Sequence, residues 1–191
     1  MRAPLILLLL LATASCAQHR TGVAVGPLLR EPLPVEGLGE PLSLSQVVTS
    51  IYQEKTHSIR VETEVSPGKL VMVGVSHIGI PLFEAALEGG ELDFRALGEA
   101  ELPFDPRYIL SDFQLAYWPF GEVKRVLAQR RYKLEHGEGE GDRLVFDEKT
   151  TLIVRVHHEQ GEGEGADLLI EHYDLPYRLQ IKTLKREGSA W

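Results

Sequence analysis

The sequence has one cysteine, Cys16, and no asparagine among its 191 residues. A single cysteine excludes an internal disulfide framework, and hairpin turns without asparagine have to rely on glycine, aspartate and proline. Basic residues are also in the minority, with 20 Lys and Arg against 28 Asp and Glu and a formal net charge of −8. Because nucleic acids are bound through basic surface, this charge balance argues against a nucleic-acid partner.

Recognisable catalytic and metal-binding motifs are lacking as well. The nearest approach to a hydrolase motif, Gly74–Gly79 (GVSHIG), misses the nucleophile-elbow spacing by one residue and joins two predicted strands, whereas that motif needs a strand-to-helix turn. His157 and His158 are neighbours in a predicted strand and therefore point to opposite faces. Two similar segments, His136–Asp142 and Gln160–Ala166, share the run GEGEG but lack the aspartate-rich spacing of calcium loops, so we interpret them as mobile, solvated hairpin loops. We therefore expect a protein that is not an enzyme and that uses no metal and no cofactor.

Residues 1–15 have the features of a secretory signal peptide. Arg2 supplies the positive start, and the apolar run Leu5–Ala12 is too short to span a bilayer. The run ends in small residues before Cys16 and resembles the bacterial lipobox, although Thr13 stands where a leucine is usual. We predict that Cys16 is lipidated and that several acyl chains anchor the protein stably in a membrane. The alternative is an ordinary signal peptide followed by an incidental cysteine.

The residue after Cys16 is Ala17 and not aspartate. By resemblance to enterobacterial sorting rules, this predicts a lipid-anchored protein on the periplasmic face of the outer membrane. Residues 16–41 are expected to form the lipidated N-terminus and a flexible tether, because glycine and proline are frequent and no periodicity is sustained. A tether of this length reaches on the order of 30 Å, which would hold the folded domain close to the membrane.

From Leu42 onward, apolar patterns with turn residues between them predict about ten strands in two groups. In the first group, Leu42, Leu44 and Gln46–Tyr52 are compatible with a strand, and the predicted strands Ser58–Val65, Lys69–Ser76, Leu82–Leu87 and Glu91–Leu97 follow. The second group consists of Arg131–Glu135, Arg143–Phe146, Thr150–His157, Asp167–Tyr173 and Tyr177–Leu184. Ser58–Val65 alternates as a half-exposed strand does, whereas Lys69–Ser76 is apolar on both faces, as in a strand covered twice. Flat open sheets of this width are uncommon. We therefore predict a mainly β (α+β) fold, a strongly curved antiparallel sheet that is closed or nearly closed, with helices on its concave side.

Two helices are predicted between the strand groups, Pro106–Pro119 and Phe120–Gln129. In the first, the apolar residues recur every three or four positions and share one side; they are Ile109, Leu110, Phe113, Tyr117 and Trp118. Ser111, Asp112 and Gln114 fall elsewhere on the helix. The stripe fits two interpretations, a helix packed on the sheet as ordinary core or a lid over a lipid-sized cavity.

Three segments together resemble a known family: Leu110–Pro119 (LSDFQLAYWP), Tyr177–Lys182 (YRLQIK) and Val73–Gly79 (VGVSHIG). They are similar to an uncharacterised family of Gram-negative outer-membrane lipoproteins encoded beside aryl polyene pigment genes, which is itself considered similar to the lipoprotein carriers LolA and LolB. The resemblance covers roughly Ser43 to Leu184. It implies an unclosed β-barrel, here assigned to residues 42–185 with a short tail at 186–191, whose apolar concave face is capped by helices and accepts acyl chains.

The resemblance leads to two sets of candidate site residues. Those for an apolar cavity or its lid are Val71, Val73, Val75, Phe83, Phe113, Leu115, Tyr117 and Trp118, although the same residues would serve an ordinary core. A membrane-contacting loop of the LolB kind would use Ile78, Ile80 and Leu82, and a buried turn is the alternative.

Two functions follow from these expectations. The first is a binding and transfer protein, which would take an acylated cargo, either a lipoprotein or a polyene lipid, into its half barrel and deliver it to the outer membrane. The second is an accessory or scaffold lipoprotein that carries nothing and contacts another envelope protein. In both cases we expect a monomer attached to the membrane through acylated Cys16.

Overall fold

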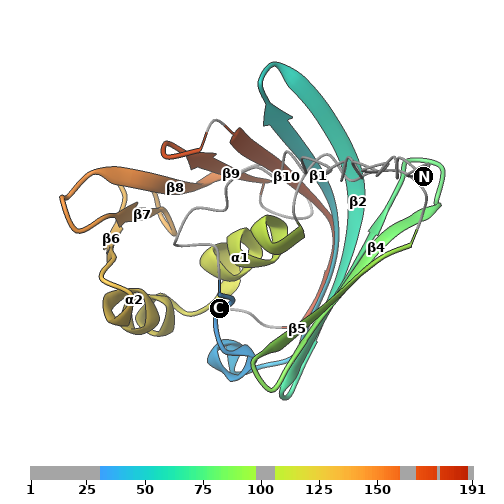
Figure 1. Cartoon of the computed structure of the whole chain (residues 1–191), viewed down its shortest axis with the longest axis horizontal. Coiled ribbons are helices and arrows are strands. Elements are labelled where there is room, and N and C mark those ends of the chain that lie inside the picture. The colour runs from blue at the N-terminus through green and yellow to red at the C-terminus, as the bar shows by residue number, and fades with distance from the viewer. Residues whose placement is uncertain (1–30, 98–105, 160–166, 176, 189–191) are drawn as a thin grey trace, which may run out of the picture.

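In the part of the chain that the structure describes, ten antiparallel strands form one sheet that curls around a central helix (Figure 1). The computed structural model describes residues 31–97, 106–159, 167–175 and 177–188. The strands are β1 (Leu42–Tyr52), β2 (Lys55–Ser66), β3 (Lys69–Val75), β4 (Pro81–Glu88), β5 (Glu91–Ala96), β6 (Lys133–His136), β7 (Arg143–Phe146), β8 (Leu152–Glu159), β9 (Asp167–His172) and β10 (Tyr177–Glu187). The predicted signal peptide, Cys16, the first part of the tether and the second GEGEG loop lie outside the described residues.

The sheet order is β5-β4-β3-β2-β1-β10-β9-β8-β7-β6. Each strand therefore pairs with its neighbours in sequence, except that β1 and β10 join the two strand groups, with Val48 opposite Ile181. Among the described strands, β5 and β6 are the two edges and do not pair with each other. The predicted antiparallel, unclosed barrel with a central helical insertion is thus confirmed.

The predicted helices are also confirmed, as α1 (Pro106–Tyr117) and α2 (Phe120–Gln129). α1 lies on the concave side of the sheet, and α2 lies close to β6 (Figure 1). Pro119 separates the two helices because it holds the N-cap position of α2 with extended backbone, a conformation compatible with its fixed φ. Of the described helices, none has both the length and the apolar character needed to cross a bilayer.

Alternation along β1 and β2 gives the sheet its apolar concave face. Leu42, Leu44 and Val48 of β1 are buried, as are Val61 and Val65 of β2. The intervening side chains face outward and are more exposed. The half-exposed alternation that the sequence predicts for Ser58–Val65 is thus confirmed.

The prediction that β3 is covered on both faces is wrong. Leu70 and Met72 are buried on the concave side, whereas Val71 and Val73 point to the convex side and are only half-buried. Their neighbours across β2 include Glu62 and Glu64, so the convex face here is a partly polar surface. A run of apolar residues could not distinguish a doubly covered strand from one that carries valine on an outer face.

The predicted flexible tether is wrong for residues 31–38. Leu33, Val35 and Leu38 are buried in the core, and Val35–Leu38 forms a short 3-10 helix. We call Glu31–Leu38 the N-terminal strap. Frequent Pro and Gly favour a flexible chain, but three apolar side chains among them are sufficient to pack the strap against the helices.

The C-terminal boundary also differs from the prediction. β10 continues to Glu187, so Arg186 and Glu187 of the predicted tail belong to the strand. Their partners are Leu44 and Ser43 of β1. The first GEGEG loop is an ordered turn, in which the Gly137 N–H donates to the Asp142 carbonyl and the Asp142 N–H donates to the Gly139 carbonyl.

Candidate functional site

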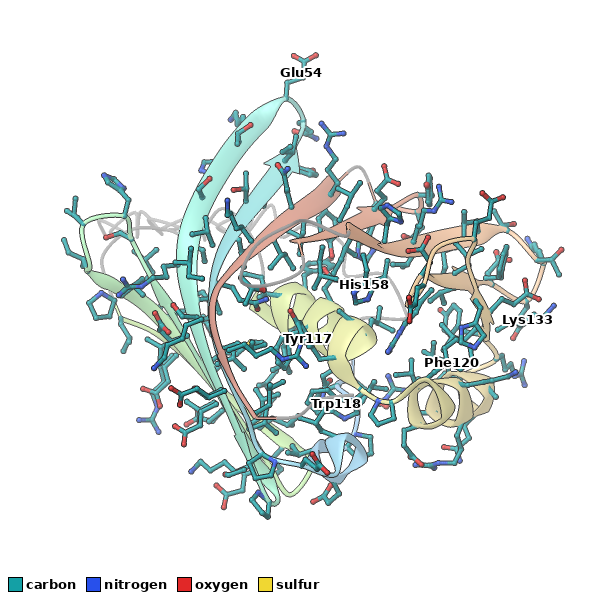
Figure 2. The ribbon with its side chains drawn as sticks, turned by 180° about the vertical axis from the view of Figure 1, so that it is seen from behind. Glu54, Tyr117, Trp118, Phe120, Lys133 and His158 are labelled. Carbon is teal, nitrogen blue, oxygen red and sulfur yellow. The ribbon has the colours of Figure 1, made fainter. Side chains whose placement is uncertain are left out.

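The candidate site is the concave face of the sheet, which is filled by α1. From Tyr108 to Trp118 every residue of this helix and its end is buried, and Figure 2 shows Tyr117 and Trp118 on the central helix, surrounded by the sheet. The sequence pattern placed Ser111, Asp112 and Gln114 off the apolar stripe, yet these three side chains are buried as well. A helix enclosed on all sides has to find internal partners for its polar residues.

The aromatic residues of α1 form one packed cluster. Phe113 lies with its ring centroid 4.8 Å from that of Tyr117 and 5.8 Å from that of Trp118. Trp118 is only 1% exposed, and a Cβ added to Gly37 of the strap would lie 2.7 Å from its Cδ1 atom. The interior beside Trp118 is therefore filled in this structure.

The predicted cavity residues fall into two groups. Phe83, Phe113, Leu115, Tyr117 and Trp118 all join the same core cluster. Val71 and Val73 do not, because they lie on the convex face. Val75 is buried next to an irregularity in the β3–β4 register and is separate from that core cluster.

Two strands of the sheet hold the C-terminal end of α1 through its tyrosine. Gln46 of β1 donates from Nε2 to the Tyr117 hydroxyl at 2.7 Å and to Oγ1 of Thr183 on β10 at 3.1 Å. Gln46 and Thr183 are both buried. The two residues are directly opposite each other in the β1–β10 ladder, so α1 is attached where the two strand groups meet.

Arg143 of β7 binds the carbonyl groups that the end of α1 leaves without helical partners. Its guanidinium donates to the carbonyl oxygens of Leu115 and Trp118, each at 2.7 Å. Burial lowers the pKa of Arg143 to about 10, which still leaves it charged at neutral pH. A buried cation at the C-terminal end of a helix also interacts favourably with the helix dipole.

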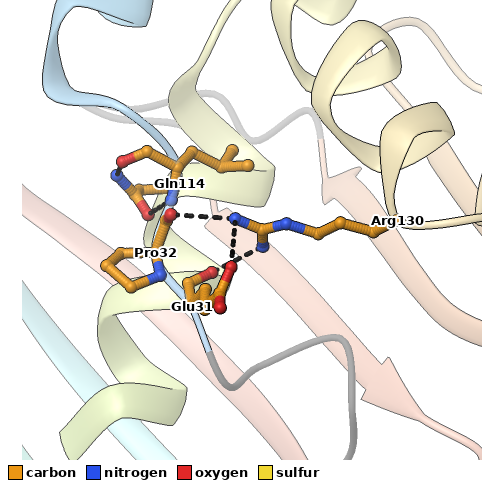
Figure 3. Close-up of polar contacts among 5 residues, drawn as sticks. Glu31, Pro32, Gln114 and Arg130 are labelled. Atoms are coloured by element: carbon orange, nitrogen blue, oxygen red, sulfur yellow. Dashed lines mark hydrogen bonds and ion pairs between the residues drawn. The ribbon is translucent and has the colours of Figure 1, made fainter. Parts of the chain in front are cut away.

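The N-terminal strap is bonded to both helices (Figure 3). Gln114 donates to the Leu33 carbonyl and accepts from the Leu33 N–H, both at 2.7 Å. The indole N–H of Trp118 donates to the Pro34 carbonyl at 2.8 Å. Arg130, the C-cap residue of α2, donates to the carbonyls of Glu31 and Pro32 at 2.6 and 3.1 Å. The strap therefore satisfies polar groups of α1 that the sheet does not reach.

A buried cluster of three residues fixes the middle of α1. Asp112 accepts hydrogen bonds from the Tyr177 hydroxyl at 2.6 Å and contacts Nε2 of His172 at 2.8 Å. Burial by itself lowers the pKa of His172, but the charge and hydrogen bond of Asp112, assisted by Asp174, outweigh it and raise the pKa to about 9. Burial, followed by the neighbouring Asp112, raises the pKa of Tyr177 well above its usual value. The cluster therefore contains a charged pair inside the protein at neutral pH.

A small pocket lies between the strap and the two helices. Its lining includes Leu33, Ser111 and Arg130, and its volume is about 10 Å³, room for about one water molecule. The Ser111 hydroxyl is buried and has no hydrogen-bond partner among the described residues. Within the same described part of the chain, no three His, Cys, Asp or Glu side chains are grouped to hold a metal ion.

The predicted membrane loop is an exposed turn between β3 and β4. Ile78 and Ile80 are 69% and 53% exposed, and Leu82 is half-buried against the core. Ser76 closes the turn, since its hydroxyl accepts the N–H of Ile80 at 3.0 Å. Leu97, which is also exposed, donates its N–H to the Leu82 carbonyl and so adds apolar surface beside this turn.

A second histidine–aspartate contact lies on the β7–β8 side of the sheet. The carboxylate of Asp142 is buried, contacts Nδ1 of His157 at 2.8 Å, and accepts the backbone N–H groups of His158 and Gly139. His157 and His158 are neighbours in the strand and contact Asp142 differently, His157 through its imidazole ring and His158 through its backbone N–H. Burial, followed by the nearby charge of Arg143, lowers the pKa of His158 to about 4.

Sequence reasoning missed most of the polar contacts of α1. Asp112 precedes His172 by 60 residues and Tyr177 by 65, so only the fold brings it to them. One signal was present: Gln46 occupies an inward position in the alternation Leu42, Leu44, Gln46, Val48, and a polar residue there predicts a buried partner.

Comparisons with known proteins add similar structures and a family. A LolA superfamily protein from Nitrosomonas europaea is 6% identical, with 77% of this chain and 85% of that chain covered and a TM-score of 0.43. A DUF1329 family protein from Desulfovibrio piger is 11% identical, with 80% and 87% covered and a TM-score of 0.38. A suggested outer membrane lipoprotein-sorting protein domain from Vibrio parahaemolyticus is 10% identical, with 81% and 87% covered and a TM-score of 0.38.

A search of curated proteins finds no match. A family model, in contrast, matches residues 43–185, which span all ten strands except the ends of β1 and β10 and include both helices. The match covers well over half of the chain. The chain belongs to the family DUF3261, described as proteins of unknown function.

Proposed function

We propose that this protein binds an acyl chain on the concave face of its sheet, in the place that α1 occupies in the structure, and delivers the acylated cargo to the outer membrane. The observation that carries the proposal is the combination of a broad apolar sheet face with a covering helix that is partly polar. The sheet contributes buried Leu, Val, Ile and Phe side chains, whereas α1 contributes Ser111, Asp112 and Gln114 along with its apolar residues.

The energetics favour a long apolar ligand. Burial of a methylene group is worth roughly 0.8 kcal/mol, so a chain of about fourteen methylenes gains roughly 11 kcal/mol before other terms are counted. Against this stand the apolar contacts of α1 and hydrogen bonds such as that between Gln46 and Tyr117, each worth about 1 kcal/mol net. An acyl chain of this length therefore recovers a substantial part of the apolar burial that α1 gives up when it leaves.

The apolar turn Ser76–Ile80 supplies a route to a membrane. Isoleucine side chains at its tip can enter the interfacial region of a bilayer, and Leu97 extends the same surface. Lipidation of Cys16 would keep the domain on the periplasmic face of the outer membrane, and the cargo would be a lipid or a lipoprotein. A polyene lipid is one such cargo, by the resemblance to proteins encoded beside aryl polyene genes.

A binding role is also proposed in preference to an enzymatic one. Ser76, the serine of the nearest hydrolase-like motif, lies in a β-turn where its hydroxyl accepts the Ile80 N–H. A nucleophile needs a base at hydrogen-bonding distance. Ser76 is used instead to close the turn.

The direct test uses the full chain with Cys16→Ser, so that bound lipid is not confused with the anchor. Mass spectrometry of an organic extract should find a co-purified lipid, and the emptied protein should take up a fluorescent fatty acid. A chain that carries no lipid and takes up none at micromolar concentration would overturn the proposal.

The second candidate is an accessory lipoprotein in which α1 fills the barrel permanently. The packed surroundings of Trp118 favour it. The two candidates differ in the mobility of α1: hydrogen exchange of its amides should be accelerated by added lipid if the helix is displaced, and should be unaffected if the helix is a permanent part of the core.

A further inference from the structure

Three uncharged polar side chains form a row across three adjacent strands of the concave face, which is otherwise apolar except for Arg143 on β7 and His172 on β9. They are Thr63 on β2, Gln46 on β1 and Thr183 on β10, and each is at most 4% exposed. Gln46 is directly opposite Thr183, and Thr63 is paired with Leu44, the next inward residue of β1. We call these three residues the polar row.

The polar row is only partly satisfied by α1. Gln46 donates to the Tyr117 hydroxyl and to Thr183, as described above. The Thr63 hydroxyl, in contrast, is fully buried and has no hydrogen-bond partner among the described residues. A buried hydroxyl without a partner is unfavourable, and its presence in a folded protein needs an explanation. Packing alone does not supply one, because valine has nearly the same shape as threonine and would fill the position without that cost.

We propose that the polar row binds the carbonyl oxygen of an ester or amide at the head of an acyl chain. This inference rests on the proposed function, since the ligand must take the place of α1. The hydroxyl of Tyr117 is the stand-in: in the structure its oxygen accepts from Gln46, as a carbonyl oxygen of the ligand would. Once a ligand replaces it, the amide of Gln46 and the hydroxyls of Thr63 and Thr183 can all donate to the ligand.

The chemistry of the polar row favours a neutral head group. Its three side chains are uncharged donors, and none of them can neutralise an ionised carboxylate. Burying a carboxylate without a cation is far more costly than burying an ester or amide that accepts hydrogen bonds. The geometry therefore points to an esterified or amide-linked acyl chain, as in lipids and acylated proteins, over a free fatty acid.

The test compares three fluorescent probes with the full Cys16→Ser chain. They are the methyl ester of parinaric acid, free parinaric acid, and the hydrocarbon diphenylhexatriene. The ester should bind tighter than the hydrocarbon by about tenfold or more, because the hydrocarbon leaves buried donors unpaired. The free acid should bind more weakly than the ester at neutral pH.

Variants separate the polar row from the rest of the face. Gln46→Leu combined with Thr183→Val should retain hydrocarbon binding, which also shows that the variant is folded, and should lose most of the preference for the ester. The matched control is Gln180→Leu combined with Thr49→Val, the same changes at convex positions paired with each other, which should keep the preference. Tyr117→Phe should strengthen ester binding, because the competing hydroxyl is gone.

The outcomes are distinct. If none of the probes binds, the proposed function fails and this inference with it. If all bind but the polar-row variant keeps the wild-type preference, the polar row is not a head-group site, while acyl binding stands. A free acid that binds tighter than the ester would overturn the neutral-carbonyl assignment.

Discussion

The charged pair between Asp112 and His172 should make the stability of the protein fall as the pH rises from neutral to alkaline. Both side chains are buried, with the carboxylate oxygen 2.8 Å from Nε2. The pKa of His172 rises from 6.5 to about 9 because, although burial lowers it, Asp112 and Asp174 favour the charged imidazolium more strongly. The imidazolium form is thus part of the native structure at neutral pH.

The sign and size of the effect follow from this shift. A raised pKa in the folded state stabilises the protein fully below the unfolded pKa of 6.5, and this contribution is lost as the pH rises through about 9. One pKa unit corresponds to about 1.36 kcal/mol, so the free energy of unfolding should decrease by about 3 kcal/mol across this window. In the variant Asp112→Asn the larger of the two charges that raise the pKa is absent, so burial should outweigh Asp174 and leave His172 neutral in the folded protein throughout the window.

The measurement is urea-induced unfolding of the wild type and of Asp112→Asn at intervals between pH 6 and pH 10. The wild type should lose stability towards pH 9, and the variant should be less stable at pH 6 but nearly independent of pH above it. Asp93→Asn is the matched control, since Asp93 forms an exposed ion pair with Arg95 and contributes little. A wild type whose stability is flat across this window, or a variant that keeps the slope, would refute the reasoning.

Three further predictions concern other parts of the molecule. Trp118→Ala should lower the free energy of unfolding by about 3 to 5 kcal/mol in urea denaturation, as for truncation of a packed aromatic residue; a loss below about 1 kcal/mol would contradict the packing seen here. His158→Gln should reduce the loss of stability on acidification, because the pKa of His158 is lowered to about 4 and stability is therefore lost as the pH falls from 6.5 towards that value; unchanged acid midpoints would contradict this. Ile78→Asp with Ile80→Asp, in the full Cys16→Ser chain, should abolish vesicle binding in flotation assays, and Val71→Asp on the convex face is the control.

Local sequence patterns were sufficient for most of the secondary structure. Strand alternation and helical spacing act over a few residues, and the ranges of β3, β7 and α2 agree with the structure to within one residue. The curvature of the sheet could also be predicted, because flat open sheets of about ten strands are uncommon. These are properties that short segments express by themselves.

The candidate site was harder to predict because its contacts join distant segments. Gln114 is hydrogen-bonded to Leu33, and Asp112 to Tyr177. The residue pattern of one segment does not predict which distant segment will contact it. The position of the strap was not predicted for the same reason. Its Pro and Gly content indicates only which backbone conformations are available to it. Its place in the fold depends on strap carbonyl groups that accept hydrogen bonds from Trp118 and Arg130, which are distant in sequence. Polar residues on a predicted apolar helix are the one local sign that such partners exist.

The same polar residues bear on whether α1 is a gate or a permanent plug. If a helix covered the sheet with leucine side chains alone, the helix and an acyl chain would make the same kind of apolar contact with the sheet at every position. α1 instead places a buried acid, Asp112, and an amide, Gln114, in the interior, so part of its stability comes from a few defined hydrogen bonds and not from apolar area. If a ligand replaces it, affinity should grow with chain length by about fourfold per methylene, at roughly 0.8 kcal/mol each, until the apolar face is filled. A series of esters from eight to eighteen carbons tests this directly: a steady rise followed by a plateau means that α1 yields its place, whereas affinity independent of length means that the probes bind elsewhere and that α1 stays in the core.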